Sequence, residues 1–402
     1  MHLSENVREL QPSATLSIAS LCRVMRDEGR EVIDLSAGEP DFRTPDFAAQ
    51  AGIAAIVQGF THYTPVAGLG ALREAIAESI AAATGRRTDP SGVVVTAGAK
   101  QALFNACFTQ FGPGDRVLIP TPYWTSYPEI VRLARAEPVF VSTSEEASFK
   151  LTIEDLDAVR DSRTRGLILN SPSNPTGIVY TRDELEQLVQ WAHRHDVLVI
   201  SDEIYGRICY TAPRAPSVLD LDDDLLDRVI VVDGASKAFA MTGWRIGYSY
   251  SSPAMAASFS ALQSHTTSNA SSPAQYAALA VYRPEPRVEH AVRAMLGVFR
   301  HRRERVTSLF RQHLPDAWFV PPDGAFYLFV RTDSYYDSGS ADSVAFCRWL
   351  LESTGVAVVP GSAFGDDRFV RVSFATAEDE LTEGIRRMGE ALSARSTAST
   401  PT

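Results

Sequence analysis

Short apolar runs recur along the middle of this chain, each followed by small or polar residues, and they constrain the fold more than any other feature. The runs are residues 93–96, 116–119, 166–169, 197–200 and 229–232. Helical spacing follows the first run, and a capping-box pattern at Thr181 and Glu184 predicts a helix that ends near His193. Short buried strands separated by helices favour an α/β fold with a mainly parallel sheet covered on both faces.

The last third of the chain indicates a second, smaller unit. Residues 285–312 carry apolar side chains at helical spacing and predict a long helix that joins two lobes. Apolar runs at 324–330, 356–360 and 369–374 predict strands of a smaller strand-and-helix lobe. The polar tail at 393–402 predicts a disordered end.

Composition argues against several classes of function. The chain has 402 residues and a formal net charge of −11, whereas a nucleic-acid partner requires a basic face. No apolar run approaches the length of a membrane span, and residues 1–10 lack the apolar core of a secretion signal, so the expected location is the cytoplasm. The four cysteines include no Cys-x-x-Cys pair, and no metal site is predicted.

Glycine and polar residues lie just after the predicted strands or after the turns that follow them. They are Gly98, Trp124, Asn174, Asp202 and Ser236. Ligands of parallel sheets collect at the carboxyl ends of the strands. We therefore expect these residues to form one site.

Lysine is scarce in this chain. Only Lys100, Lys150 and Lys237 occur among 38 Lys and Arg positions. An arginine cannot replace an amine that must become neutral and attack a carbonyl. Lys237 lies among small residues, with Ser236 before it and Arg245 eight positions later, which suits a Schiff-base site beside a phosphate.

These residues match the needs of pyridoxal phosphate. The cofactor requires an amine for its aldehyde and a carboxylate that keeps the pyridine nitrogen protonated, which Lys237 and Asp202 offer. Tyr205 and Asn174 suit the phenolic oxygen, and Trp124 offers a face for ring stacking. A phosphate prefers a helix N-terminus, hydroxyls and a cation. The candidates for it are the amides of Gly98, Ala99 and Lys100, with Ser236 and Arg245.

Each residue also has an ordinary structural explanation. An aspartate after a strand is often a helix cap, and Trp124 or Tyr205 alone would usually be core residues. Arg371 could serve in a surface salt bridge instead of clamping a substrate carboxylate. A nucleotide-binding loop is excluded because no lysine follows a glycine.

The chain resembles fold-type I pyridoxal phosphate aminotransferases of class I/II, a branch that includes bacterial aspartate aminotransferases. The similarity covers residues 10–391. The segments that carry it are residues 11–15, 36–42, 62–68, 96–105, 122–128, 170–177, 201–205, 233–245, 324–327, 359–365 and 371–375.

The resemblance implies a large α/β/α domain at 46–294 and a smaller α+β domain built from 1–45 and 295–402. It implies that Lys237 binds the cofactor and shuttles a proton, that Asp202 pairs with the pyridinium, and that Tyr205 and Asn174 contact the phenolic oxygen. Further implied roles are phosphate binding by Gly98, Ala99, Ser236 and Arg245, stacking by Trp124, carboxylate binding by Gly38, Asn174 and Arg371, and a pocket wall at Phe326. Tyr63 is implied to reach the phosphate of a neighbouring subunit, and hence a homodimer with shared sites.

The resemblance predicts transamination between an L-amino acid and a 2-oxo acid, expected to be 2-oxoglutarate. A pyridoxal phosphate lyase or synthase that works by elimination or cyclisation is the alternative. Ala99 stands where relatives often have glycine or serine, so a hydroxyl contact with the phosphate is lost there. The amino donor is expected to be aspartate, an aromatic amino acid or a related one, and its side chain stays open, with Lys100 as one candidate for binding a distal carboxylate.

Overall fold

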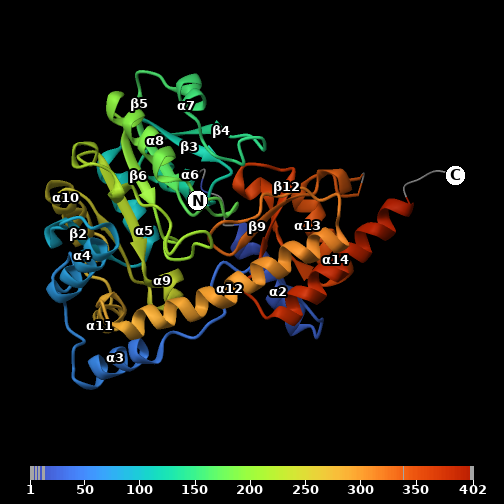
Figure 1. Ribbon diagram of the computed structural model, residues 1–402, viewed down its shortest axis with the longest axis horizontal. Helices are drawn as coiled ribbons and strands as arrows, with labels where there is room; N and C mark the ends of the chain where they lie inside the picture. The colour runs from blue at the N-terminus through green and yellow to red at the C-terminus, as the bar shows by residue number, and fades with distance from the viewer. Residues whose placement is uncertain (1–3, 5–6, 8–9, 11–13, 338, 399–402) are drawn as a thin grey trace.

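The computed structural model describes all residues except 1–3, 5–6, 8–9, 11–13, 338 and 399–402 (Figure 1). Its main feature is a seven-stranded sheet of order β2-β8-β7-β6-β5-β3-β4. Only β8 runs antiparallel to its neighbours, which confirms the mainly parallel sheet. The strands are β2 (Val93–Thr96), β3 (Arg116–Thr121), β4 (Glu137–Ser142), β5 (Thr164–Asn170), β6 (Leu198–Asp202), β7 (Val229–Gly234) and β8 (Gly247–Tyr250).

Helices cover both faces of this sheet, and we call the sheet with these helices the large lobe. Alternate residues of the strands point to opposite faces: Ile200 packs with α5, α6 and α10, whereas Val199 packs with α4, α8 and α11. This double burial explains why the predicted strands contain continuous apolar runs. The helices are α3 (Asp46–Val57), α4 (Gly70–Thr84), α5 (Ala99–Gln110), α6 (Ser126–Leu133), α7 (Ile153–Val159), α8 (Arg182–Arg194), α9 (Ala235–Ala238), α10 (Pro253–Ser264) and α11 (Ser272–Tyr282).

Two sequence-based helix predictions are confirmed. The capping box is present, because the Thr181 side chain accepts from the amide of Glu184 and the Glu184 side chain accepts from the amide of Thr181. The long helix is α12 (Pro286–His313), whose 28 residues run along both lobes (Figure 1).

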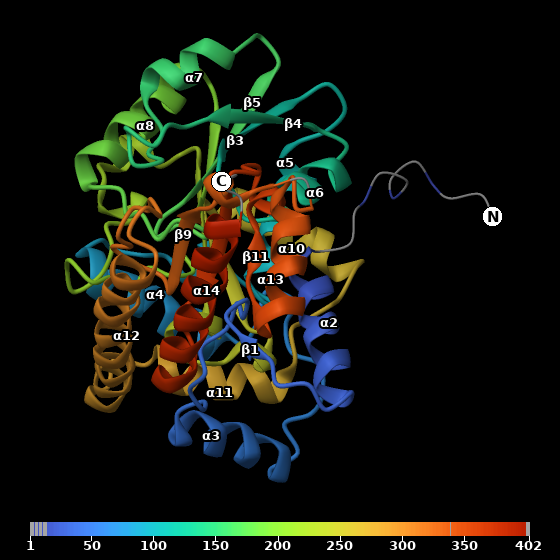
Figure 2. The same cartoon turned by 90° about the vertical axis from the view of Figure 1, so that its right-hand side faces the viewer.

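The small lobe combines the two ends of the chain. Strands β11 (Val359–Pro360), β12 (Phe369–Ser373) and β9 (Tyr327–Arg331) form an antiparallel sheet, and β1 (Ile33–Asp34) pairs in parallel with β10 (Val356–Ala357). Helix α2 (Ala14–Asp27) packs against α13 (Ser343–Thr354), and Figure 2 shows the two beside each other. This pairing agrees with a domain built from 1–45 and 295–402, although the domain boundaries stay predictions.

The predicted disorder of residues 393–402 is wrong for its first part. Helix α14 (Glu378–Ala398) continues through this stretch, whereas 399–402 lie outside the described residues. Arg395 explains the extension, because its guanidinium donates to Asp337 at 2.7 Å and stacks on the ring of Trp349 at 4.2 Å. These contacts attach the last turns of α14 to the small lobe.

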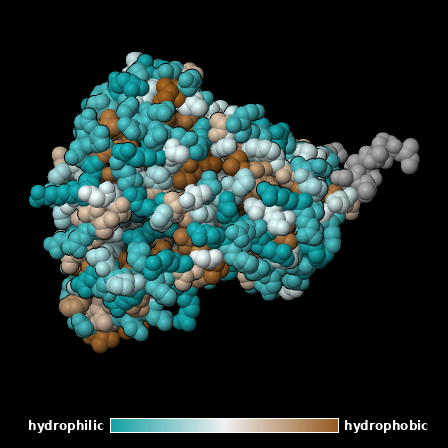
Figure 3. All heavy atoms as spheres, viewed as in Figure 1, coloured by the Kyte–Doolittle hydropathy of each residue, from teal (hydrophilic) through white to brown (hydrophobic). Residues whose placement is uncertain are grey.

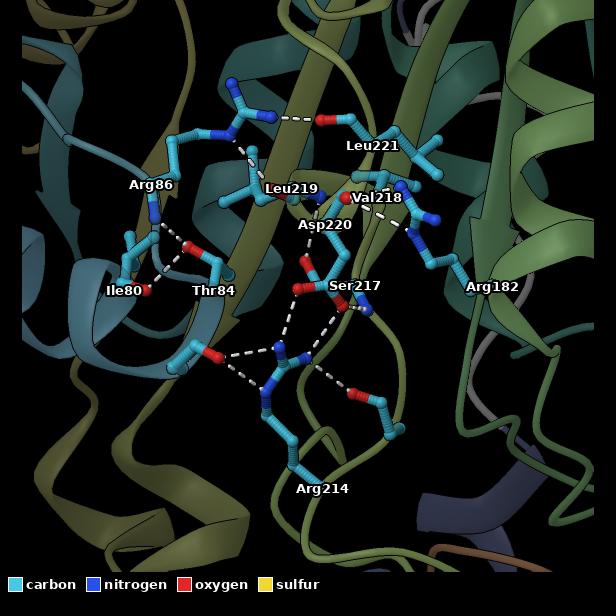
Figure 4. Close-up of polar contacts among 12 residues, drawn as sticks. Ile80, Thr84, Arg86, Arg182, Arg214, Ser217, Val218, Leu219, Asp220 and Leu221 are labelled. Carbon is cyan, nitrogen blue, oxygen red and sulfur yellow. Dashed lines mark hydrogen bonds and ion pairs between the residues drawn. The ribbon is translucent and has the colours of Figure 1, made fainter.

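Arginines secure the loop that follows the end of β6 (Figure 4). Arg214 donates to both carboxylate oxygens of Asp220, at 2.6 and 2.9 Å, and Arg86 donates to the carbonyl of Leu219 at 2.9 Å. The amide of Val218 in turn donates to the carboxylate of Glu203 at 3.1 Å. The loop is thereby tied to the residue next to Asp202, and the end of β6 is held from outside.

Within the described residues, none of the helices combines the length and the apolar character that a membrane crossing requires.

Candidate active site

A cavity of about 520 Å³ opens at the carboxyl ends of the central strands. Its wall comes from both lobes, since residues after β5, β6 and β7 face the segment around Gly38 and Arg371 of β12. The structure brings most of the sequence-predicted residues to this wall. These are Gly38, Ala99, Lys100, Trp124, Asn174, Asp202, Tyr205, Ser236, Lys237, Arg245 and Arg371.

Lys237 presents a buried amine to the cavity. Its Nζ donates to the carbonyl oxygen of Gly38 at 2.5 Å. Burial lowers the pKa of Lys237 to about 8, with a further lowering from the positive charge of Arg371 and an opposing effect from Glu39. About a tenth of this amine is therefore neutral at pH 7, which supplies the form that a nucleophile or a base requires.

Asp202 is a buried carboxylate at the end of β6, with 3% of its surface exposed. Its Oδ2 accepts a hydrogen bond from the hydroxyl of Tyr127 at 2.8 Å, and its Oδ1 accepts from the amide of Ile204 at 3.2 Å. Burial raises the pKa of Asp202 to about 6, although these two hydrogen bonds act to lower it. Near neutral pH the carboxylate is ionised and suited to a cationic partner.

Tyr205 and Asn174 lie on the same wall. The hydroxyls of Tyr205 and Tyr327 are 2.9 Å apart, and burial raises the pKa of Tyr205 well above its ordinary value. The amide of Asn174 donates to the side chain of Asn170 at 2.8 Å. The Asn174 carboxamide oxygen accepts from Arg371 Nη1 at 3.0 Å.

Arg371 is a buried cation whose hydrogen-bond donors are not all used within the described residues. It is 1% exposed and stacks on the ring of Tyr327 at 4.3 Å. One Nη donates to Asn174 and the other to the carbonyl of Ser36 at 2.7 Å, while Nε has no partner among the described residues. No described side chain forms an ion pair with it. A buried guanidinium in this state favours an anionic ligand such as a carboxylate.

The turn between β2 and α5 forms a cradle for an anion. Gly98 has a φ of 83°, and a Cβ added there would lie 2.2 Å from Arg245 Nη2. Only glycine therefore lets the guanidinium approach the N-terminus of α5, where backbone amides and the helix dipole favour negative charge. Arg245 donates to the carbonyl of Thr242 at 3.1 Å, and Ser236 lies nearby on the wall of the cavity.

Three of the predicted residues, Gly98, Phe326 and Tyr63, do not line the cavity. Phe326 is fully buried and packs behind Tyr205, with ring centroids 5.5 Å apart, and its neighbour Tyr327 faces the cavity instead. Tyr63 lies outside the cavity and is 91% exposed.

The predicted residues also contact four side chains or carbonyls that were not predicted as part of the site: Tyr127, Tyr327, Asn170 and Ser36. All four lie in segments that carry the family resemblance, but no spacing rule shows which of them reaches Asp202 or Asn174.

The donor set fits pyridoxal phosphate. A buried amine, a carboxylate, an anion cradle that tolerates no Cβ and a guanidinium with an unpartnered Nε meet in one cavity. Comparison with known proteins agrees, since residues 30–388 match the model of the family described as aminotransferase class I and II. The chain belongs to this family.

Relatives match the chain over nearly its whole length. An aspartate aminotransferase of Bacillus subtilis is 40% identical, covering 96% of this chain and 98% of the relative. An aspartate/prephenate aminotransferase of Nitrosomonas europaea is 38% identical, covering 98% and 100%. The crystal structure of an aspartate aminotransferase from Thermotoga maritima is 38% identical with a TM-score of 0.90, covering 97% and 100%.

The protein is thus a pyridoxal phosphate-dependent aminotransferase with the fold-type I architecture. This confirms the predicted family, fold class, enzyme class and cofactor. The lyase or synthase alternative receives no support, because these relatives are named as aminotransferases.

Proposed function

We propose that Lys237 holds the cofactor covalently and, once an amino acid has displaced it, carries a proton to and from the substrate Cα. Pyridoxal phosphate supplies an electron-withdrawing ring that stabilises negative charge at that carbon. The observation that carries the proposal is the buried Lys237 amine, whose pKa is lowered to about 8 in a cavity shared with Asp202 and Arg371. Because its pKa lies close to neutral pH, this amine can both accept and release a proton.

The other residues bind and orient. Asp202 keeps the ring nitrogen protonated, Tyr205 and Asn174 contact the phenolic oxygen, and Trp124 stacks on the ring. The phosphate is bound by the amides of Gly98, Ala99 and Lys100, by the Ser236 hydroxyl and by Arg245. Gly38, Asn174 and Arg371 bind the substrate carboxylate. The Arg371 Nε has no partner among the described residues, which supports this role.

We further propose that the amino donor is aspartate or a related dicarboxylic amino acid and that the acceptor is 2-oxoglutarate. Among the described residues, the cations on the cavity wall are Lys100, Lys237, Arg245 and Arg371. The last three have roles toward the cofactor or the α-carboxylate, which leaves Lys100 for a second carboxylate. Its Nζ lies 5.0 Å from the ring of Trp124, and the names of the relatives agree with this substrate class.

The substrate is tested by mixing the holoenzyme with single amino acids and following the change in the visible absorbance of the bound cofactor. For Lys100→Gln we expect a roughly tenfold to hundredfold loss of kcat/KM with aspartate, since a hydrogen bond to a charged group is lost. Alanine should be little affected, because the backbone amide at position 100 is kept. Lys150→Gln is the matched control. Lys150 forms an ion pair with Glu184, with 2.7 Å between Nζ and the carboxylate, and it does not line the cavity. An equal loss with every amino acid would contradict the role of Lys100.

We propose that two copies of the chain form a homodimer in which Tyr63 reaches the partner's phosphate. Ile53, Ile56, Val57 and Phe60 on and after α3 are 60%, 58%, 81% and 43% exposed, and Tyr63 follows them. Figure 3 shows apolar side chains gathered at the lower left, where α3 lies. Apolar side chains clustered in this way mark an interaction site.

A mixing experiment tests the shared site. Lys237→Ala and Tyr63→Phe chains are unfolded and refolded together, and transamination is measured at limiting cofactor. Half of the dimers should be mixed and each should hold one complete site, so about a quarter of the sites should regain wild-type activity. The control is a mixture of wild-type chains with the Lys237→Ala/Tyr63→Phe double variant, which contains the same two substitutions in the same proportions but on one chain. Sedimentation as a monomer, or no gain on mixing, would contradict the proposal.

A further inference from the structure

Tyr127 contacts the carboxylate at the centre of the cavity although it belongs to none of the proposed binding groups. It lies in the first turn of α6, is 2% exposed, and its hydroxyl donates to Asp202 Oδ2 at 2.8 Å. Its ring meets that of Trp124 edge to face, with centroids 5.4 Å apart. One side chain therefore touches both the proposed stacking residue and the proposed partner of the ring nitrogen.

We propose that Tyr127 is a positioning residue that keeps the Asp202 carboxylate ionised and aimed at the cofactor nitrogen. The inference rests on the proposed role of Asp202. Each oxygen of Asp202 accepts one bond from the protein, Oδ2 from Tyr127 and Oδ1 from the amide of Ile204. A carboxylate oxygen has a second acceptor position, which stays available for the ring nitrogen while the first fixes the plane of the group.

The charges around Asp202 make this bond important. Among the described residues, no cation hydrogen-bonds to its carboxylate or forms an ion pair with it. The groups that face it are Tyr127 from α6, Lys237 from α9 and Tyr205 from the following loop. Burial raises the pKa of Asp202, and the Tyr127 bond is the largest effect that lowers it, followed by the Ile204 amide and Lys237. When Lys237 is a neutral amine, it no longer attracts the Asp202 carboxylate. The hydrogen bonds from Tyr127 and Ile204 are then the effects that still lower the pKa of Asp202.

A buried phenol suits this task. Burial and the adjacent Asp202 raise the pKa of Tyr127 well above its ordinary value, so the hydroxyl keeps its proton and always donates. Hydrogen bonds to the charged form of a carboxylate favour that form. Tyr127 therefore favours the ionised carboxylate without bringing a positive charge that would compete with the ring nitrogen.

The test measures the dissociation constant of pyridoxal phosphate from the full chain between pH 5 and pH 8.5. In the wild type the affinity should fall below about pH 6, where Asp202 takes up a proton. In Tyr127→Phe the pKa of Asp202 rises, so this fall should begin roughly one to two pH units higher. The affinity at pH 6.5 should then drop roughly tenfold relative to the wild type, with little difference at pH 8.5. Titration of the cofactor's own groups is common to both proteins and cancels in the ratio.

Tyr282→Phe is the matched control. Tyr282 is also buried, at 4% exposed, and its hydroxyl has no partner among the described residues, so its removal should leave the midpoint unchanged. Incorporation of 3-fluorotyrosine at position 127 keeps the fold and makes the donor more acidic, so the midpoint should move down. This second variant gives a result of opposite sign should Tyr127→Phe fail to fold.

The outcomes separate this inference from the role of Asp202. Titration of Lys237 and of the cofactor's own groups remains in Asp202→Asn, so the ratio of wild-type to Asp202→Asn affinity isolates the Asp202 carboxylate and should fall below about pH 6. If this ratio does not change with pH, both the proposed role of Asp202 and the role of Tyr127 are overturned. If the ratio falls as expected but folded Tyr127→Phe keeps the wild-type midpoint, or loses affinity equally at every pH, only the role of Tyr127 is overturned.

Discussion

Lys237→Ala is expected to lower the rate of transamination by at least about 10⁴-fold, because it removes both the covalent anchor and the general base. Neither function can pass to a neighbour. Arg245 and Arg371 are guanidinium groups that stay charged. Lys100 also lies on the wall of the cavity, but its Nζ lies 5.0 Å from the ring of Trp124, whereas Lys237 Nζ donates to the carbonyl of Gly38.

The measurement combines steady-state rates with borohydride reduction of the holoenzyme and peptide mapping. The chain has only three lysines, so a reduced cofactor adduct is easily assigned. In the wild type the adduct should be at Lys237, and in the variant no lysine should carry it. Lys150→Ala is the control and should keep its activity, since Lys150 pairs with Glu184 on the large lobe. A Lys237→Ala protein with near-normal turnover, or an adduct at Lys100 in the wild type, would contradict the proposal.

The central strands could be predicted because both of their faces are buried. In β6 every residue is buried, and its sequence shows an apolar run at residues 197–200 that leads into Ser201 and Asp202. Strand β4 was not predicted, because it lies at the edge of the sheet and alternates between exposed and buried residues over only six positions. Strand β8 was missed because its sequence, Gly-Tyr-Ser-Tyr, lacks the run of aliphatic residues that marks β2 and the other predicted strands.

The site residues that could be predicted are those that directly follow the central strands. Asp202 and Lys237 come at or just after the ends of β6 and β7, where a parallel sheet exposes them to a common ligand. The contacts among side chains could not be predicted in this way. Tyr127 reaches Asp202 from 75 positions earlier in the chain, and Arg371 reaches Asn174 from the other lobe. Such pairings depend on how the elements pack.

Asp202→Ala is expected to keep the cofactor bound but to lower kcat by about 10³-fold, the order of effect of losing a preorganised charge contact in the transition state. In the proposed arrangement Lys237, Ser236 and Arg245 should still anchor the cofactor, whereas the ring nitrogen should lose the carboxylate that keeps it protonated and thus electron-withdrawing. Retention of the cofactor is read from visible absorbance and kcat from single-turnover proton transfer with Cα-deuterated substrate.

Asp233→Asn is the matched control for Asp202. Asp233 is also a carboxylate at the end of a central strand, but it bonds to the amide of Gly234 at 2.6 Å and to the hydroxyl of Tyr248 at 3.2 Å and does not line the cavity. Its loss should leave kcat near that of the wild type. A cofactor analogue methylated on the ring nitrogen carries the positive charge without a carboxylate partner, so it should restore part of the activity of Asp202→Ala. Unchanged turnover in Asp202→Ala, or equal losses in both aspartate variants, would refute the assignment, because the effect would then not depend on a charge beside the ring.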